Sequence, residues 1–169
     1  MKKNLTLTGM MGVGKSTIGK AISKRLSMEF IDIDKIIEKK LELSVQKIFE
    51  NKGEVFFRGF EENVTLEELK KKNKVISLGG GSFMNAKIRD SVILDTKSFW
   101  LHLDATLLEK RLAHSKKRPL LTNKNVRIDL EKIYKERKTT YSLADYKVNC
   151  NNLHSNLIIK KIITLYEND

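Results

Sequence analysis

The residues with the clearest chemical potential are Gly-Met-Met-Gly-Val-Gly-Lys-Ser at positions 9–16. They fit the phosphate-loop pattern of a glycine, four further residues and then Gly-Lys-Ser. Such a loop presents successive backbone N–H groups at a helix N-terminus, where the helix dipole favours an anion. We therefore predict that Lys15 reaches the β- and γ-phosphates of a nucleotide and that the Ser16 hydroxyl ligates Mg²⁺.

Two aspartates, Asp32 and Asp34, follow the next strand-like segment, residues 30–33. In open α/β sheets the carboxyl ends of the strands face the crevice that binds ligands. One carboxylate could hold Mg²⁺ through water, and the other could accept a proton from an attacking hydroxyl. Acids at strand ends are also common helix caps, and we expect Asp34 to cap a helix that runs to about residue 41.

Arg58 and Glu61 stand three residues apart on a predicted helix and therefore share one face of it. An ordinary surface ion pair is one interpretation. The functional interpretation is an arginine fork that Glu61 orients so that it can grip a carboxylate. Arg137, on a later predicted helix, could supply the second half of such a clamp.

Three consecutive glycines, residues 79–81, directly follow another strand-like segment. Three glycines in a row cost much chain entropy and are rarely needed for a plain turn. We predict that they allow a small ligand to lie against bare backbone.

Residues 115–125 are polar, rich in lysine and hold the only proline of the chain, Pro119. This is the one predicted loop of unusual length, which favours a mobile lid. Arg118 in this segment could fold onto a transferring phosphoryl group as an arginine finger. A solvated surface charge is the alternative for Arg118, as it is for Arg137.

The elements that must position these residues alternate between strand-like and helix-like segments. This alternation indicates an α/β fold with a mainly parallel sheet covered on both faces. A strand at 5–8 and a helix at 17–26 flank the phosphate loop and argue against a chance glycine turn. Further strands are expected at 30–33, 74–77, 99–103 and around 148, and further helices at 34–41, 44–50, 54–72, 85–94, from Thr106, at 129–145 and at 155–167. Ser44 and Thr106 are expected to cap the helices that begin there, and Gly53 is expected to end the helix from Ser44.

Composition restricts the class of protein. The chain has 169 residues, 40% of them hydrophobic, which suits one domain with a substantial core. No apolar run approaches the length that spans a bilayer, so no membrane partner is expected. Cys150 is the single cysteine, so no intrachain disulfide can form and a cytoplasmic location is expected. The net charge of +12 favours anionic partners. Nucleic acid is not expected among them, because no aromatic residues are interleaved with the lysine runs.

Taken together, these residues resemble the shikimate kinases over nearly the whole chain. The matching motifs are Gly-x-x-Gly-x-Gly-Lys-Ser-Thr at 9–17, Asp-x-Asp at 32–34, Ser-Val-x-x-Ile-Phe at 44–49, Gly-Glu-x-x-Phe-Arg-x-x-Glu at 53–61, the glycines at 79–81 and Arg-Pro-Leu-Leu at 118–121. The resemblance implies one domain over 1–169 with a three-layer, five-stranded parallel sheet flanked by helices. It also implies a substrate-binding region at about 33–61 and a lid at about 114–125.

The same resemblance implies ATP-dependent phosphorylation of the 3-hydroxyl of shikimate by a cytoplasmic monomer. The catalytic residues would be Lys15, Asp34 and Arg118. Mg²⁺ would be held by Ser16 and, through water, by Asp32. ATP would be bound by Gly12, Val13, Gly14, Lys15, Ser16, Thr17, Arg111 and Arg118, with Arg111 on the adenine. Shikimate would be bound by Asp34, Phe49, Phe57, Arg58, Glu61, Gly79, Gly80, Gly81 and Arg137.

One segment departs from the family pattern. Shikimate kinases often carry a proline in the adenine loop after the last strand, where this chain has Asn-Asn-Leu-His-Ser at 151–155. Three other functions stay open on the sequence. They are a gluconate or nucleoside monophosphate kinase of the same fold, a catalytically idle nucleotide-binding module, and a nucleic-acid-binding protein that uses the positive charge.

Overall fold

A computed structural model describes residues 3–112 and 126–168, so the predicted lid at 114–125 and Arg118 lie outside the described residues. The described part forms one five-stranded sheet in the order β2-β3-β1-β4-β5, in which every pairing is parallel. The elements are β1 (Asn4–Thr8), α1 (Lys15–Leu26), β2 (Glu29–Asp32), α2 (Ile33–Leu41), α3 (Val45–Leu69), β3 (Lys74–Ser77), the 3₁₀ helix η1 (Ser82–Met84), α4 (Ala86–Asp95), β4 (Thr96–His102), α5 (Ala105–Leu112), α6 (Val126–Tyr141), β5 (Tyr146–Asn149) and α7 (Ser155–Glu167).

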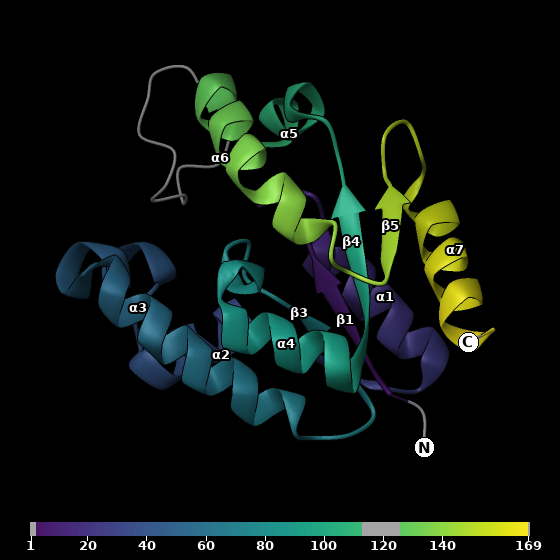
Figure 1. The fold of residues 1–169 in the computed structure, drawn as a ribbon, viewed down its shortest axis with the longest axis horizontal. Helices are drawn as coiled ribbons and strands as arrows, with labels where there is room; N and C mark the ends of the chain where they lie inside the picture. Colours follow the sequence, from purple (N-terminus) through teal and green to yellow (C-terminus); the bar gives the residue numbers. More distant parts are fainter. Residues whose placement is uncertain (1–2, 113–125, 169) are drawn as a thin grey trace.

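Helices flank the sheet, as Figure 1 shows. Helix α1 packs against α7, and α4 packs against α3 and β4. Every residue of the central strand β1 is buried, as expected for a parallel strand with neighbours on both sides. The predicted α/β fold with a five-stranded parallel sheet is therefore confirmed.

The register of the strands brings three chain segments to the same edge of the sheet. Asp32 at the end of β2 pairs with Ser77 at the end of β3, and Ser77 pairs with Leu7 of β1. The phosphate loop follows β1 directly, and the glycines at 79–81 follow β3. The carboxyl edge of the sheet therefore presents the phosphate loop, Asp32 and the glycine run side by side.

Two predicted helix caps are each wrong by two positions. Asp32, not Asp34, caps α2, because the Asp32 Oδ1 accepts a hydrogen bond from the Lys35 N–H at 3.3 Å. Ile33 is already helical and fully buried, so Asp34 lies in the first turn. Helix α5 likewise begins before Thr106, at Ala105. The Asp104 carbonyl accepts hydrogen bonds from the N–H groups of Leu107 and Leu108.

The predicted break at Gly53 is a kink inside a longer element. Ser44 caps α3 as predicted, its hydroxyl accepting from the Lys47 N–H at 3.3 Å. The helix then runs on to Leu69 with only Gly53 in a non-helical conformation, at φ 79° and ψ 168°. A positive φ is available to glycine at little steric cost, which explains why the kink falls there.

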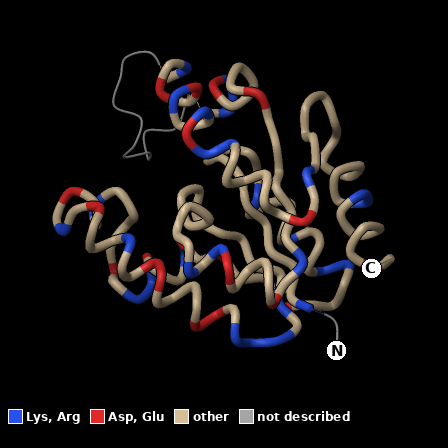
Figure 2. Tube along the Cα trace, in the orientation of Figure 1, with Lys and Arg blue, Asp and Glu red and all other residues tan. Residues whose placement is uncertain are grey.

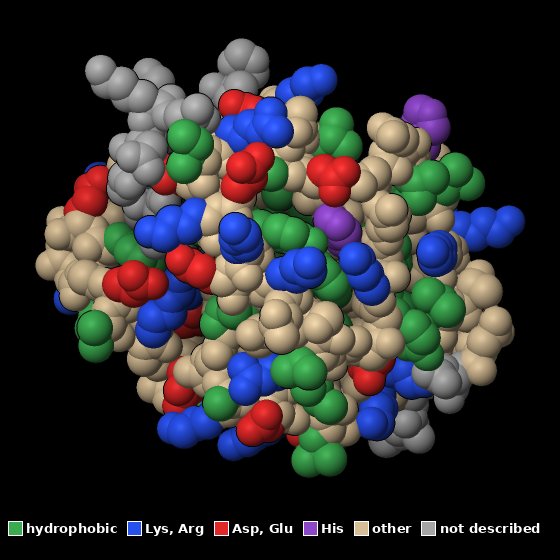
Figure 3. Space-filling view, turned by 45° about the horizontal axis from the view of Figure 1, so that its top comes forward, with side chains coloured by type: hydrophobic (Ala, Val, Ile, Leu, Met, Phe, Trp, Pro, Cys, Tyr) green, Lys and Arg blue, Asp and Glu red, His purple; other side chains and the backbone are tan. Residues whose placement is uncertain are grey.

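Charged residues of both signs are mixed along α2 and α3 in Figure 2 and on the face drawn in Figure 3. Figure 2 shows basic and acidic residues interspersed along α2 and α3. On the face drawn in Figure 3, Lys and Arg side chains are spread across the surface with Asp and Glu among them. This distribution is typical of a solvated surface. Among the helices within 3–112 and 126–168, none has both the length and the apolar character needed to cross a membrane.

Candidate active site

One cavity of about 400 Å³ joins the phosphate loop to the predicted acid-binding residues. Its walls come from the loop and first turn of α1, the end of β2, helices α2 and α3, the glycine run and α6. The predicted site residues that line it are Gly12, Gly14, Lys15, Ser16, Thr17, Asp32, Asp34, Phe49, Phe57, Arg58, Glu61, Gly79, Gly80, Gly81 and Arg137. The tertiary structure therefore brings into one space residues that are more than 120 positions apart in the chain.

The ammonium group of Lys15 is folded over the phosphate loop. Lys15 is the first residue of α1 and follows Gly14, whose φ of 102° turns the chain into the helix. Its Nζ donates to the carbonyl oxygens of Gly9 at 2.8 Å and Met10 at 3.1 Å, and the side chain is buried. These contacts hold a positive charge at the mouth of the loop, where the helix dipole also favours phosphate.

Ser16 and Asp32 meet at the end of β2. The Ser16 hydroxyl donates to the Asp32 Oδ2 at 2.5 Å. Hydroxyl and carboxylate oxygens are the hard ligands that Mg²⁺ prefers, and Mg²⁺ usually takes only one or two protein ligands besides water and substrate phosphates. Within the described residues, no cluster of three His, Cys, Asp or Glu side chains could hold a metal by itself. The donor set therefore fits a metal that arrives with nucleotide phosphates.

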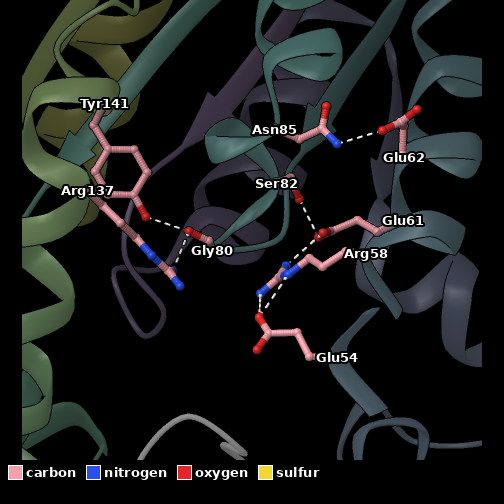
Figure 4. A network of polar contacts seen from close by, with 9 residues as sticks. All are labelled: Glu54, Arg58, Glu61, Glu62, Gly80, Ser82, Asn85, Arg137 and Tyr141. Atoms are coloured by element: carbon pink, nitrogen blue, oxygen red, sulfur yellow. Dashed lines mark hydrogen bonds and ion pairs between the residues drawn. The ribbon is translucent and has the colours of Figure 1, made fainter. Parts of the chain in front are cut away.

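Arg58 and Glu61 do not form an ordinary surface ion pair, because Glu61 is only 1% exposed. The Glu61 Oε2 accepts from the Arg58 Nη1 at 2.7 Å, and its Oε1 accepts from the Ser82 hydroxyl at 2.5 Å (Figure 4). The Arg58 Nε and Nη2 donate to the Glu54 Oε1, each at 3.2 Å. Burial by itself lowers the pKa of Arg58. The carboxylates of Glu61 and Glu54 together raise this pKa by more than burial lowers it, so the net shift is upward and the guanidinium stays charged.

The glycine run packs directly against these polar side chains. A Cβ on Gly79 would lie 2.5 Å from the Glu61 Oε1 and 2.8 Å from the Asp34 Oδ1. A Cβ on Gly81 would lie 2.7 Å from the Arg58 Nη1. The absence of side chains at Gly79 and Gly81 therefore makes room for the protein's own carboxylates and guanidinium. The sequence predicted space for a ligand and did not indicate this packing role.

Replacing Gly79 by alanine is expected to push Glu61 and Asp34 out of position. We expect kcat/KM for the acid substrate to fall between about ten- and a hundredfold, because small displacements of positioning groups have effects of this size. Steady-state kinetics would measure it. Gly59→Ala is the matched control, because Gly59 is in α3 and a Cβ there meets no atom within 4 Å. Equal kinetics for Gly79→Ala and Gly59→Ala would contradict the packing argument.

Arg137 reaches the same glycine run from α6. Its Nη1 donates to the Gly80 carbonyl at 2.9 Å. Figure 4 shows the guanidinium groups of Arg137 and Arg58 on either side of the glycine run, and both residues line the cavity. The two arginines proposed as a carboxylate clamp thus share one space.

Arg111 and Val13 are the two predicted site residues in the described part that do not line the cavity. They contact each other, because the Arg111 Nη1 donates to the Val13 carbonyl at 3.0 Å. Arg111 therefore braces the outside of the phosphate loop from α5. Its contact with adenine stays a prediction.

Six residues of the cavity wall were not among the predicted site residues: Met11, Lys35, Glu38, Val45, Ser77 and Leu78. The Lys35 Nζ donates to the Glu38 Oε2 at 2.6 Å, and the Glu38 Oε1 accepts from the Val45 N–H at 3.1 Å. Glu38 therefore ties α2 to the start of α3. Helical spacing could have indicated it, because Glu38 is four residues after Asp34 and so shares its face of α2.

A model of the shikimate kinase family matches residues 11–167. The chain belongs to the shikimate kinase family. A shikimate kinase of Bacillus subtilis is 40% identical over 156 residues, which cover 90% of this chain and 82% of the relative. A shikimate kinase of Bartonella quintana is 34% identical over 167 residues, which cover 99% of this chain and 80% of the relative.

Solved structures of the shikimate kinase family agree with this assignment. Shikimate kinase from Acinetobacter baumannii in complex with shikimate has a TM-score of 0.95 at 32% identity and covers 99% of this chain and 94% of its own. A gluconokinase from Sinorhizobium meliloti has a TM-score of 0.59 at 17% identity over 98% of this chain and 94% of its own, a likeness that shows the fold alone. This gluconokinase is therefore similar to the chain only in fold, whereas the shikimate kinases named above are similar in sequence as well.

Proposed function

We propose that this ATP-dependent kinase transfers the γ-phosphoryl group of ATP to the 3-hydroxyl of shikimate, giving 3-phosphoshikimate and ADP in aromatic amino acid biosynthesis. The observation that carries the proposal is the shared cavity, whose walls include the phosphate loop, two arginines and Asp34. Shikimate is a small ring with one carboxylate and several hydroxyls. Two guanidinium forks suit the carboxylate, and an aspartate suits a hydroxyl.

The donor side of the cavity supplies charge stabilisation. Phosphoryl transfer needs little covalent chemistry from the protein and depends on positioning and on neutralising negative charge. The hydroxyl oxygen of the acceptor forms a bond to the γ-phosphorus while the bond from that phosphorus to the bridging oxygen of ADP breaks. Lys15 and Arg118 would stabilise the charge on the transferring group, and Asp34 would hold the attacking hydroxyl in line and take up its proton.

The acceptor side is built to hold the acid. We propose that Arg58 and Arg137 bind its carboxylate, with Glu61 fixing Arg58. Phe49 and Phe57 would wall the ring. Their ring centroids are 4.7 Å apart, and the Arg58 guanidinium carbon lies 5.2 Å from the Phe57 centroid. The guanidinium is thus supported by an aromatic face as well as by carboxylates, which keeps its fork aligned before the acid arrives.

We further propose that Ser16 and Asp32 hold Mg²⁺ together with the ATP phosphates, Asp32 through water. When bound, the metal would neutralise phosphate charge. The change Asp32→Asn tests this, because asparagine still caps α2 but carries no charge. The Mg²⁺ concentration for half-maximal activity is expected to rise about tenfold, with little change in melting temperature. Asp90→Asn, at an exposed position of α4, is the control. An unchanged Mg²⁺ requirement in Asp32→Asn would remove Asp32 from the metal site.

The remaining proposals concern the organisation of the chain. Residues 1–169 are proposed to form one kinase domain, with a substrate-binding region at about 33–61 and a lid at about 114–125. The active unit is proposed to be a monomer, as the resemblance to the shikimate kinases implies. The use of ATP supports a cytoplasmic location.

ADP release from ATP and Mg²⁺, measured with and without shikimate, tests the proposed function. We expect release to depend on shikimate, with gluconate and AMP giving little. Comparable turnover with gluconate or AMP would favour another kinase of this fold. Tight ATP binding without turnover on any of the three would favour an idle nucleotide-binding module.

A further inference from the structure

The carbonyl oxygen of Gly80 accepts two hydrogen bonds from α6. One comes from the Arg137 Nη1 at 2.9 Å and the other from the Tyr141 hydroxyl at 2.5 Å (Figure 4). A carbonyl oxygen has two lone pairs, so these two donors fill its capacity. Arg137 and Tyr141 are four residues apart and share one face of the helix. The sequence offered no signal for Tyr141, which was not among the predicted site residues.

The ring of Tyr141 is held in place independently of this hydrogen bond. Tyr141 is 0% exposed, and its ring stacks on Trp100 of β4 at 5.8 Å between centroids. Trp100 stacks on His102 at 5.5 Å, and His102 stacks on Tyr134 of α6 at 5.5 Å. Two rings from the strand thus pack with two rings from the helix. The packing of the ring therefore places the Tyr141 hydroxyl beside the Gly80 carbonyl. Burial raises the pKa of Tyr141, so the phenol stays protonated and can donate.

Gly80 is also the place where the glycine run approaches the phosphate loop. A Cβ on Gly80 would lie 3.3 Å from the Met11 backbone nitrogen. The carbonyl that anchors Arg137 thus belongs to backbone that lies close to the loop, and it is hydrogen-bonded to α6. Arg137 has five N–H donors, so those not used on Gly80 are available to a ligand in the cavity.

We propose that Tyr141 is a positioning residue for the acid site, whose hydroxyl holds the Gly80 carbonyl so that Arg137 has a fixed anchor and aims its remaining donors into the cavity. The inference rests on the proposed function, because it assigns Arg137 to the carboxylate of the acid. Tyr141 touches no substrate in this scheme. Its effect passes through Gly80 and Arg137.

The variant Tyr141→Phe tests this by removing the hydroxyl and leaving the stacked ring. We expect KM for shikimate to rise about fivefold, the size typical for loss of one neutral hydrogen bond, while kcat and KM for ATP stay within about twofold. The rise in melting temperature caused by shikimate should shrink in the same variant, which gives a readout of binding that does not depend on turnover. An unchanged KM for shikimate, or an equal rise in KM for ATP, would overturn the inference.

Two comparisons separate positioning from a general loss of stability. Tyr166→Phe is the matched control, because the buried Tyr166 hydroxyl also donates to a backbone carbonyl, that of Lys3, at 2.6 Å and lines no part of the cavity. It should lower the melting temperature without changing KM for shikimate. In an Arg137→Ala background, Tyr141→Phe should have no further effect on KM, because the group it positions is gone.

The outcomes distinguish the two levels of the argument. A persistent effect of Tyr141→Phe in the Arg137→Ala background overturns the route through Arg137. If the wild-type protein turns over shikimate and Tyr141→Phe has the same KM for shikimate as the wild type, this inference alone is overturned. Absence of shikimate turnover by the wild-type protein overturns the proposed function and the inference with it.

Discussion

Replacing Lys15 by alanine is expected to lower kcat on the order of 10³-fold, the size seen when a preorganised stabiliser of transition-state charge is removed. Lys15 is buried over the phosphate loop, with its Nζ bonded to the Gly9 and Met10 carbonyls. Its charge is therefore in place before the nucleotide binds and needs little reorganisation during the reaction. The measurement is the rate of ADP release at saturating ATP, Mg²⁺ and shikimate.

The control for this variant is Lys24→Ala, because Lys24 is an exposed lysine in the last turn of the same helix. It removes the same charge from the chain without touching the loop. Melting curves would show that both variants fold. Near-normal turnover by a folded Lys15→Ala protein would refute the assignment of the loop as the phosphate site.

Replacing Arg58 by alanine is expected to raise KM for shikimate by about ten- to a hundredfold, because hydrogen bonds to charged groups contribute about 1.5–3 kcal/mol. The reason is structural as well as electrostatic. Arg58 is the group that Glu61, Glu54 and the Phe57 ring hold in one orientation. KM for ATP should change little. The change also leaves the buried Glu61 without its cation, so the melting temperature should fall.

The control for Arg58→Ala is Lys71→Ala. It also removes the cation from an ion pair with a buried glutamate of α3, although Lys71 itself follows the helix. The Lys71 Nζ lies 2.6 Å from the Glu68 Oε1, and Glu68 is buried. A drop in stability without a change in KM is expected there. Arg58→Lys should give an intermediate KM, because it keeps the charge and loses the planar fork. If Arg58→Ala altered only the binding of ATP, the acid clamp would be misplaced.

The sequence by itself determined the features that depend on local spacing. The phosphate loop is a run of eight residues, the Ser44 cap precedes its helix directly, and the pairing of Arg58 with Glu61 follows from the helical repeat. The alternation of strands and helices was enough to predict a mainly parallel sheet, and the family resemblance implied five strands; the structure confirms both. The loop, the cap and the ion pair each lie within about one element of the chain, so no knowledge of distant neighbours was required to predict them.

The choice between Asp32 and Asp34 as the cap of α2 shows where local spacing ceased to be decisive. Both residues can cap a helix, and the sequence alone favoured Asp34. In the structure Asp32 is the cap. The strand was predicted to end at residue 33 but ends at Asp32, because the buried Ile33 already belongs to the helix. Packing of one apolar side chain therefore separated the roles of two carboxylates.

Only the tertiary structure decided which polar groups are buried and what they meet. Glu61 is shielded from water by packing and bonds Ser82, which is 21 positions away, while Tyr141 reaches Gly80 across 61 positions. Gly79 and Gly81 are needed because side chains of α2 and α3 occupy the space that a Cβ would fill. The physical reason is that hydrogen bonding within a turn is set by neighbours in the chain, whereas exclusion of water from a side chain depends on whatever folds over it.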